Sequence, residues 1–438
     1  MENNFSLFLA AVWQTLKNWW WLSLPFILWR PFLFQYRFWK VNEWLKKQKS
    51  VSLEIMLPKE VLKPIRAMES VIAGIGAAIY KPPDWWETWV DGEVQLNIHL
   101  ELVSIDGNPH FYIRVPTSLK KAAESTIYAQ FPEAEIRVVE DYVKTVPQNI
   151  PNKDWDLFGS DYKLLKDDAY PIKTHPEFET EHETKEEKRV DPIAALMEAF
   201  AAMQPGEQFW VQISIEPMGD DPPYSTNLSD FVNKAKKLRD QLAKRPEKVV
   251  KTKPIIQGVA EILIHGKTDD EPAKEKEMFP PEMRLTPGER DIVASIESKI
   301  SKPLFKTNIR FIYLGPKKVW VKANFRFIFT FFNQFMTVNR NGLIPVGKTI
   351  TKIHKTWFLP LNLIQKRRHY MRCRKLFRNY VRRFTPYFPK PGGTFMMNTE
   401  ELASLFHFPG KTVVPTPSVS RVEAKKGGTS SLDLPTEE

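Results

Sequence analysis

Residues 94–115 read VQLNIHLELVSIDGNPHFYIRV, and this stretch decides the fold. Apolar side chains occupy every second position from Val94 to Leu102, a period of two that predicts a strand with one apolar face. The Asp-Gly-Asn sequence at 106–108 is a turn signal, and a second alternating run, HFYIRV, follows at 110–115. The stretch therefore predicts two antiparallel strands joined by a tight turn.

The sequence on both sides of this hairpin completes a larger unit. Residues 51–58, VSLEIMLP, alternate in the same way, and a helical pattern follows them. After the hairpin we expect a helix up to Phe131 and a last strand at 133–139. This order is that of the ferredoxin-like split unit, so we predict a β-α-β-β-α-β domain over residues 50–145. His99 falls on the polar side of its strand and is expected at the surface.

A second, interrupted α+β domain is predicted over residues 191–315. It contains an alternating strand, EQFWVQISIEP, and a helix that opens with a capping box formed by Thr286 and Glu289. A charged insertion at 218–285 separates these two elements and weakens the case for a true repeat of the first domain. Residues 146–190 include a run rich in glutamate and predict an acidic linker between the domains.

The first 40 residues predict a membrane anchor. Residues 19–34 form an apolar run that is only just long enough to cross a bilayer with tilt. Aromatic rings at the edges of such a run favour the headgroup zone. The anchor residues of this kind are Trp19, Trp20, Trp21, Trp29, Phe32, Phe34, Tyr36 and Trp39. The Lys and Arg residues that follow place the rest of the chain in the cytoplasm; the alternative is a helix that lies in the interface without crossing it.

The net charge of +11 is concentrated in one block of the chain. Between Ser298 and Thr399 there is no Asp or Glu and there are 22 Lys and Arg residues. The remainder holds 41 basic and 52 acidic residues, so the whole positive excess lies in this block. Such asymmetry indicates an anionic partner, which is nucleic acid, anionic lipid or the acidic surface of a protein.

A basic helical region is predicted over residues 316–410, followed by a flexible tail at 411–438. Its main element is a helix at 363–384 with one apolar face. The remaining surface carries the cations expected to bind nucleic acid or an acidic partner: Lys366, Arg367, Arg368, Arg372, Arg374, Lys375, Arg378, Arg382 and Arg383. Acidic surfaces of the chain itself or anionic lipid near the anchor would neutralise the same charges.

The phosphate-loop pattern G-x-x-x-x-G-K-[ST] occurs once, as GLIPVGKT at 342–349. A working loop needs small residues whose amide groups converge on phosphate, whereas four bulkier residues stand here and Pro345 removes one amide. The preceding segment is polar instead of a buried strand. We therefore expect no nucleotide site, and the scattered histidines and single cysteine give no metal-ligand pattern. No cofactor, metal ion or catalytic residue is predicted.

The stretch FMMNTEELASLFHFPGKTVVPTPSVSRVEAKKG, with the upstream LTPGERDIVASIESKISKPLFKTNIRFIYL, carries a resemblance to a known family. It resembles the membrane-proximal region of bacterial type IV secretion and conjugative-transfer coupling ATPases of the HerA/FtsK type. In that family a motor domain follows this segment, whereas this sequence ends at SSLDLPTEE. The resemblance implies a segment that docks a partner: Asn398, Thr399, Glu400, Glu401, Leu402, Phe406, His407, Phe408 and Pro409.

Two classes of function follow. The first is a non-enzymatic accessory subunit, anchored at the bacterial inner membrane with its bulk in the cytoplasm. It would dock a separately encoded translocation ATPase of a type IV secretion or DNA-transfer system. The second is a membrane-anchored nucleic-acid-binding module that acts without a motor. Physically, Asn398 predicts a helix cap and His407 is expected to pack between its phenylalanine neighbours instead of taking part in catalysis.

Overall fold

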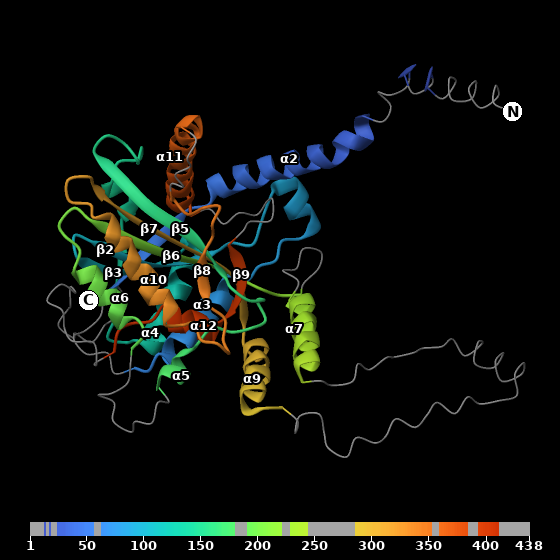
Figure 1. Ribbon diagram of the computed structural model, residues 1–438. Coiled ribbons are helices and arrows are strands. Elements are labelled where there is room, and N and C mark those ends of the chain that lie inside the picture. Colours follow the sequence, from blue (N-terminus) through green and yellow to red (C-terminus); the bar gives the residue numbers. More distant parts are fainter. Residues whose placement is uncertain are drawn as a thin grey trace, which may run out of the picture.

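The computed structural model describes residues 13–14, 17–18, 24–56, 63–179, 191–220, 228–243, 285–352, 359–383 and 393–410. Nine strands form one sheet in the order β4-β1-β3-β2-β6-β7-β5-β8, and β9 pairs with the start of β7 (Figure 1). The strands are β1 (Ser50–Met56), β2 (Ile98–Ile105), β3 (Asn108–Pro116), β4 (Glu135–Val139), β5 (Trp155–Leu164), β6 (Gln208–Pro217), β7 (Leu304–Pro316), β8 (Leu343–Pro345) and β9 (Thr394–Asn398).

Helices cover both faces of this sheet and extend beyond it. The α-helices are α2 (Leu24–Lys47), α3 (Arg66–Ile79), α4 (Lys120–Gln130), α5 (His175–Glu179), α6 (Ala194–Ala201), α7 (Leu228–Leu242), α9 (Pro287–Ser301), α10 (Arg326–Asn333), α11 (Leu359–Val381) and α12 (Thr399–Leu405). Short helical turns are η2 (Glu87–Asp91), η3 (Thr117–Leu119), η4 (Tyr142–Thr145) and η7 (Lys322–Phe325). The prediction of a mixed α+β fold is therefore confirmed.

The ferredoxin-like prediction is confirmed in element order and in pairing. β1, α3, β2, β3, α4 and β4 follow one another, and the four strands lie in the order β4-β1-β3-β2. The hairpin between β2 and β3 turns at Asp106 and Gly107, both in the left-handed region of backbone conformation. Glycine has no Cβ to strain this conformation, which explains the tight reversal read from the sequence.

The predicted division into two separate domains is wrong. β6 pairs antiparallel with β2 over eight residues, from Gln208 to Ile215, so the second set of strands continues the first sheet. The predicted acidic linker is also wrong over much of its length, because it contains β5, which pairs with β7 and β8. Its glutamate-rich part, 180–190, lies outside the described residues, as does most of the charged insertion and all of the tail at 411–438.

The two faces of the sheet differ in character. One face is apolar and packs against α3, α4, α6, α10 and α12, which together enclose the main hydrophobic core. The opposite face carries polar residues in rows across the strands, and α11 packs on part of it through Cys373, Leu376, Phe377 and Tyr380. The basic helical region is thus partly strand, because β8 and β9 belong to the sheet.

The predicted membrane helix corresponds in part to α2, which runs away from the sheet (Figure 1). Within the part of the chain that the structure describes, none of the helices has the length and apolarity needed to span a bilayer. Trp19, Trp20 and Trp21 lie outside the described residues. The backbone of α2 packs closely against Gly92, where an added Cβ would lie 2.5 Å from the carbonyl carbon of Lys40.

Candidate functional site

A row of polar side chains crosses the face of the sheet that α11 partly covers. Strand register places Glu54, Tyr112, Glu101, Gln212, Arg310 and Asp161 side by side on β1, β3, β2, β6, β7 and β5. Glu101, Gln212 and Arg310 are almost completely buried. Because burying charged groups is unfavourable unless they are paired, this row must be neutralised within the fold.

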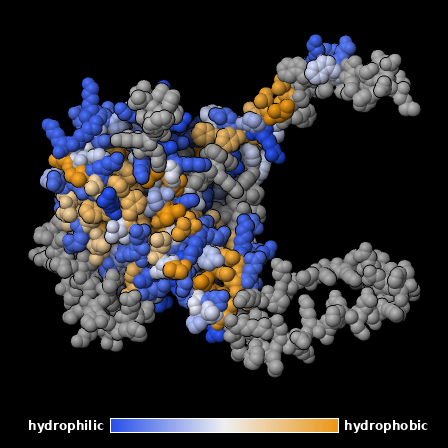
Figure 2. Space-filling model, viewed as in Figure 1, coloured by the Kyte–Doolittle hydropathy of each residue, from blue (hydrophilic) through white to orange (hydrophobic). Residues whose placement is uncertain are grey.

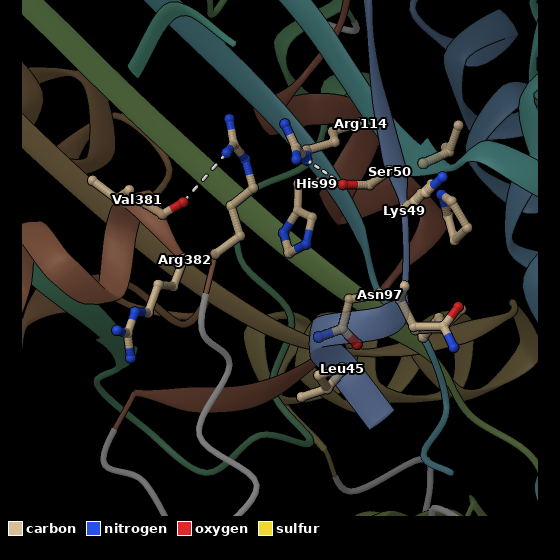
Figure 3. Close-up of a pocket in the computed structure, with 13 residues that line it drawn as sticks. Leu45, Lys49, Ser50, Asn97, His99, Arg114, Val381 and Arg382 are labelled. Carbon is tan, nitrogen blue, oxygen red and sulfur yellow. Dashed lines mark hydrogen bonds between the residues drawn. The ribbon is translucent and has the colours of Figure 1, made fainter. Parts of the chain in front are cut away.

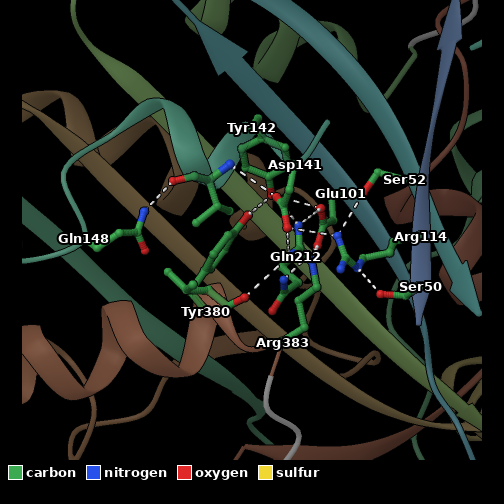
Figure 4. Close-up of polar contacts among 12 residues, drawn as sticks. Ser50, Ser52, Glu101, Arg114, Asp141, Tyr142, Gln148, Gln212, Tyr380 and Arg383 are labelled. Atoms are coloured by element: carbon green, nitrogen blue, oxygen red, sulfur yellow. Dashed lines mark hydrogen bonds and ion pairs between the residues drawn. The ribbon is translucent and has the colours of Figure 1, made fainter. Parts of the chain in front are cut away.

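Arg383 neutralises the centre of the row (Figure 4). Its Nε donates to Glu101 Oε1 at 2.8 Å, and its two terminal nitrogens donate to Asp141 at 2.6 and 2.8 Å. Gln212 Nε2 and the Tyr142 hydroxyl donate to the two Glu101 oxygens at 2.8 and 2.9 Å. The arginine thus binds two carboxylates at once, and it is held at the end of α11 in the left-handed conformation, with φ 50°.

The predicted role of Arg383 as an exposed docking cation is therefore wrong. The sequence alone groups Arg383 with the basic face of α11. Arg383 instead lies just beyond the last residue of the helix, and its side chain reaches Glu101 on the sheet. The physical reason is the buried Glu101, which no local residue on β2 neutralises. No signal in the sequence marks this burial, because Glu101 continues the alternation of polar residues in VQLNIHLELV in the same way as Asn97 and His99.

Electrostatics keeps both carboxylates of this network ionised. Burial acts to raise the pKa of Glu101, but the charge and hydrogen bonds of Arg383 outweigh burial and lower that pKa below its usual range. Burial likewise acts to raise the pKa of Asp141. Arg383 and Arg114 act to lower it, and the resulting pKa is again below the usual range. Arg114 completes the network by donating to Asp141 at 2.9 Å and to Ser50 and Ser52 at 2.9 and 3.0 Å.

His99 is not the surface residue predicted from the sequence. It is partly buried beside Arg114, and its Nδ1 lies 2.8 Å from the Ser214 hydroxyl on β6. Burial lowers the pKa of His99 to about 3; Glu101 opposes this shift, and Arg383 and Arg114 add to it. The imidazole is therefore neutral at physiological pH.

The exposed surface of α11 carries the other predicted cations. The helix prediction is confirmed, with Cys373 and Phe377 on its buried face. Lys366, Arg367, Arg368, Arg374, Lys375, Arg378 and Arg382 are exposed and Arg372 is partly exposed. Arg374 contacts the carbonyl oxygen of Asn149 and the ring of Tyr370. None of these eight forms an ion pair with a described carboxylate, so within the described part of the chain α11 presents a surface of cations without acidic partners.

The predicted docking segment lies inside the protein. Asn398 caps α12, as the sequence predicted, and the structure adds a capping box with Glu401. The side chains that the resemblance assigned to docking are all buried: Asn398, Thr399, Glu400, Glu401, Leu402, Phe406, His407, Phe408 and Pro409. The assignment to a contact surface is therefore wrong, because the apolar spacing of this segment packs it against α3 and the sheet.

Polar members of this buried segment are paired inside the fold. Glu401 forms an ion pair with Lys299 at 3.0 Å, with both side chains fully buried. His407 Nε2 lies 2.8 Å from Asp191 Oδ1, while its Nδ1 lies 2.9 Å from the Ala403 carbonyl oxygen. Both ring nitrogens of His407 are thus engaged in polar contacts within the fold, which the prediction of packing between phenylalanines did not include.

Large apolar side chains are exposed on α2 and beside it. Figure 2 shows hydrophobic residues on the part of α2 that runs away from the sheet. Of the predicted anchor residues, Trp29, Phe32, Phe34 and Trp39 are exposed and Tyr36 is partly buried. Sequence reasoning missed Trp85 and Trp86, which are exposed at the start of the η2 region that contacts α2. The pair of adjacent tryptophans in KPPDWWETW was the signal that could have found them.

Comparison with models of protein families finds a family that matches most of the chain. The family model of a domain of unknown function, DUF8128, matches residues 97–421. The chain belongs to the DUF8128 family. No curated protein matches the chain. The DUF8128 match includes Glu101, Asp141 and Arg383, whereas α2 and β1 lie before it.

Two candidate chemical sites in the DUF8128 region are occupied by structural contacts. In GLIPVGKT, residues 343–345 form β8, and the amides of Val346 and Thr349 donate to carbonyl oxygens of Asp161 and Val346. Cys373 Sγ lies 3.6 Å from His369 Nε2, but burial raises the pKa of the thiol to about 12, which keeps it protonated. Among the described residues, no group of three or more His, Cys, Asp or Glu is placed to hold a metal ion.

Proposed function

We propose that this DUF8128 protein is a non-enzymatic, membrane-associated accessory subunit that docks a partner through the cationic surface of α11. The observation that carries the proposal is the placement of two surfaces. The aromatic helix α2 and the cationic helix α11 lie on the same side of the molecule (Figure 1). Leu45 of α2 and Val381 of α11 line one shared cavity, which brings the two helices together at the body.

Membrane association is supported by the composition of α2 and its surroundings. Trp29 and Phe32 each remain 59% exposed, and Trp86 remains 63% exposed. In water such rings leave large apolar areas unburied, whereas the interfacial region of a bilayer accommodates both the ring and its polar edge. Lys46 and Lys47 in the last turn of α2 add attraction to anionic headgroups. The bacterial inner membrane, with the sheet on the cytoplasmic side, is the proposed location.

The partner is proposed from charge and from the resemblance to HerA/FtsK-type coupling ATPases. The segment that carries the resemblance is buried and does not present a contact surface. We therefore assign the docking of an acidic face of a separately encoded ATPase to the exposed cations of α11. Opposite charge steers such encounters and sets the orientation of the partners more than it sets affinity. The subunit itself would act in type IV secretion or DNA transfer by positioning the motor at the membrane.

Vesicle sedimentation tests the membrane part of the proposal. Replacing Trp29, Phe32 and Trp39 with Gln removes exposed apolar area without charge change, and we expect binding to anionic vesicles to fall at least tenfold. The matched control replaces Tyr128, Val138 and Leu165, which are exposed apolar residues elsewhere. Equal binding by the two triple variants would contradict membrane association through α2.

Purification from native membranes tests the partner. We expect mass spectrometry of the co-purified proteins to identify a translocation ATPase. The variant with Gln at Arg367, Arg368 and Lys375 should lose it while keeping its melting temperature, because these three side chains are exposed. Retention of the ATPase by the variant would exclude α11 as the docking surface.

A nucleic-acid-binding module is the second candidate, favoured by the exposed Tyr370 among the cations of α11. Arginine and aromatic side chains together suit single strands, because bases stack on rings while cations contact phosphates. If this candidate is right, the same triple variant should bind single-stranded DNA more weakly whatever the sequence. The plot of log affinity against log salt concentration should become less steep, by the amount that corresponds to the loss of up to about three phosphate contacts.

A further inference from the structure

A cavity of about 330 Å³ lies where the end of α2, the edge of the polar sheet face and the end of α11 meet. Figure 3 shows His99 in its centre, with Arg382 on one side and Lys49 and Ser50 on the other. Thirteen residues line it; four of them are Lys or Arg and none is Asp or Glu. A cavity with several cations and no carboxylate in its wall attracts anions.

Two of the four cations are neutralised within the fold and two are not. Arg383 gives its donors to Glu101, Asp141 and the Val381 carbonyl oxygen, so it forms a fixed part of the wall. Arg114 donates through Nε and Nη1 to Ser50, Ser52 and Asp141, while its Nη2 has no partner among the described residues.

Lys49 and Arg382 supply the excess charge of the cavity. Both are exposed, and neither forms an ion pair with a described residue. Since the carboxylates of Glu101 and Asp141 balance two of the four cations, the surroundings of the cavity keep a charge of about +2, which matches a phosphate monoester near neutral pH and also attracts the lower charge of a phosphodiester.

Neutral groups beside the cations suit a ligand that also carries hydroxyls. Gln48 and Asn97 add amide groups to the wall, and His99 adds an imidazole that Ser214 orients. Leu45, Leu96 and Val115 form an apolar side. The volume is at the small end of the range for ligand cavities, which limits the ligand to a few carbons in addition to the anionic group.

We propose that this cavity binds a phosphate ester of the size of glycerophosphate. The phosphate contacts Lys49, Arg382 and the remaining donor of Arg114, and the hydroxyls contact the amide and imidazole groups. The ester comes either from the headgroup of an anionic phospholipid or from a free organic phosphate. The site goes beyond membrane association, since it is built on β1, β2, β3 and the end of α11 and does not need the exposed rings of α2.

Isothermal titration calorimetry of the full chain with sn-glycerol 3-phosphate tests the site. The variant carries Lys49→Gln and Arg382→Gln, and the matched control carries Arg367→Gln and Lys375→Gln, an equal charge change on α11 outside the cavity. Each charge-assisted contact corresponds to about a tenfold change, so the variant should bind about a hundredfold more weakly. The control should stay within about twofold of wild type.

Vesicles of phosphatidylglycerol in phosphatidylcholine distinguish the two sources. Binding of sn-glycerol 3-phosphate that the cavity variant loses supports a free organic phosphate. Absence of such binding, together with weaker vesicle binding by the cavity variant than by the control, supports a lipid headgroup. If the two variants behave alike with both probes, the proposal is overturned. Lys49→Gln alone, at an exposed position before β1, replaces the double variant should that one fail to fold.

Discussion

Leu100, Ile113 and Ile213 meet across three strands on one face of the sheet, while Glu101, Tyr112 and Gln212 meet in the next row on the other. Both rows are buried, yet they are stabilised differently. The apolar row needs only close packing against helices, which many hydrophobic sequences provide. The polar row needs specific partners, and it obtains them from Arg383 at the end of α11.

This difference affects how each face tolerates change. Loss of an apolar side chain leaves a cavity that neighbours fill in part. Loss of Arg383 leaves two carboxylates, Glu101 and Asp141, without their main partner in a region that water reaches poorly. Removing one member of a buried ion pair is therefore more damaging than replacing the pair together. The polar face also fixes the position of α11, whose cations form the proposed docking surface.

The largest effect is expected from Arg383→Met, which tests the polar face directly. Because Glu101 loses the cation that pairs with it and Asp141 keeps only Arg114, we expect the free energy of unfolding to fall by about 3–5 kcal/mol. The neighbouring Arg382→Met is the matched control and should change it by less than about 0.5 kcal/mol, since Arg382 is exposed. Urea unfolding measures both. Equal effects would show that the buried network contributes nothing.

On the apolar face, Phe406→Ala should lower the free energy of unfolding by about 3 kcal/mol. The ring no longer contributes its hydrophobic burial, and the cavity that it leaves is only partly filled by neighbours. Phe406 is fully buried and packs edge-to-face on Phe111 with ring centroids 6.2 Å apart. Val138→Ala, at an exposed position, is the control. Urea unfolding would contradict the buried position of α12 if Phe406→Ala were as mild as the control.

Acidification should reduce the difference between wild type and Arg383→Met. The folded pKa values of Glu101 and Asp141 lie below the ordinary ones, so their stabilising contribution is complete above about pH 4.5 and is lost as the pH falls through the folded values. The variant lacks this contribution. Unfolding measured from pH 7 down to pH 3 should therefore show the two proteins converging, and a constant gap would exclude ionised carboxylates as the cause.

The smallest effect is expected on the outer surface of α11. Arg367→Gln with Lys375→Gln should alter the free energy of unfolding by less than about 0.5 kcal/mol, because both side chains are exposed and form no ion pair with a described residue. Thermal unfolding at low and high salt provides the measurement. A marked loss of stability would mean that these cations are neutralised within the fold, and a docking partner would no longer be needed to explain them.

Local pattern was sufficient for many elements. The period of two found β1, β2, β3 and β6, while the capping box at Thr286 and the cap residue Asn398 marked the starts of α9 and α12. β5 was assigned to a linker because the glutamate-rich run after it led to the prediction of an acidic linker over all of residues 146–190. Its identity as a strand comes from pairing with β7, which is separated from it by about 150 residues of chain.

The sequence by itself determined the ferredoxin-like order, the apolar face of each strand and the charge of the basic block, because these depend on residue spacing within short windows. Only the tertiary structure decided that nine strands form one sheet, that the docking segment is buried and that Arg383 enters the core. A polar residue on a strand reads the same whether water or a distant helix covers it. The partner that compensates Glu101 lies 282 positions away in the chain, and that contact exists only once the sheet has assembled.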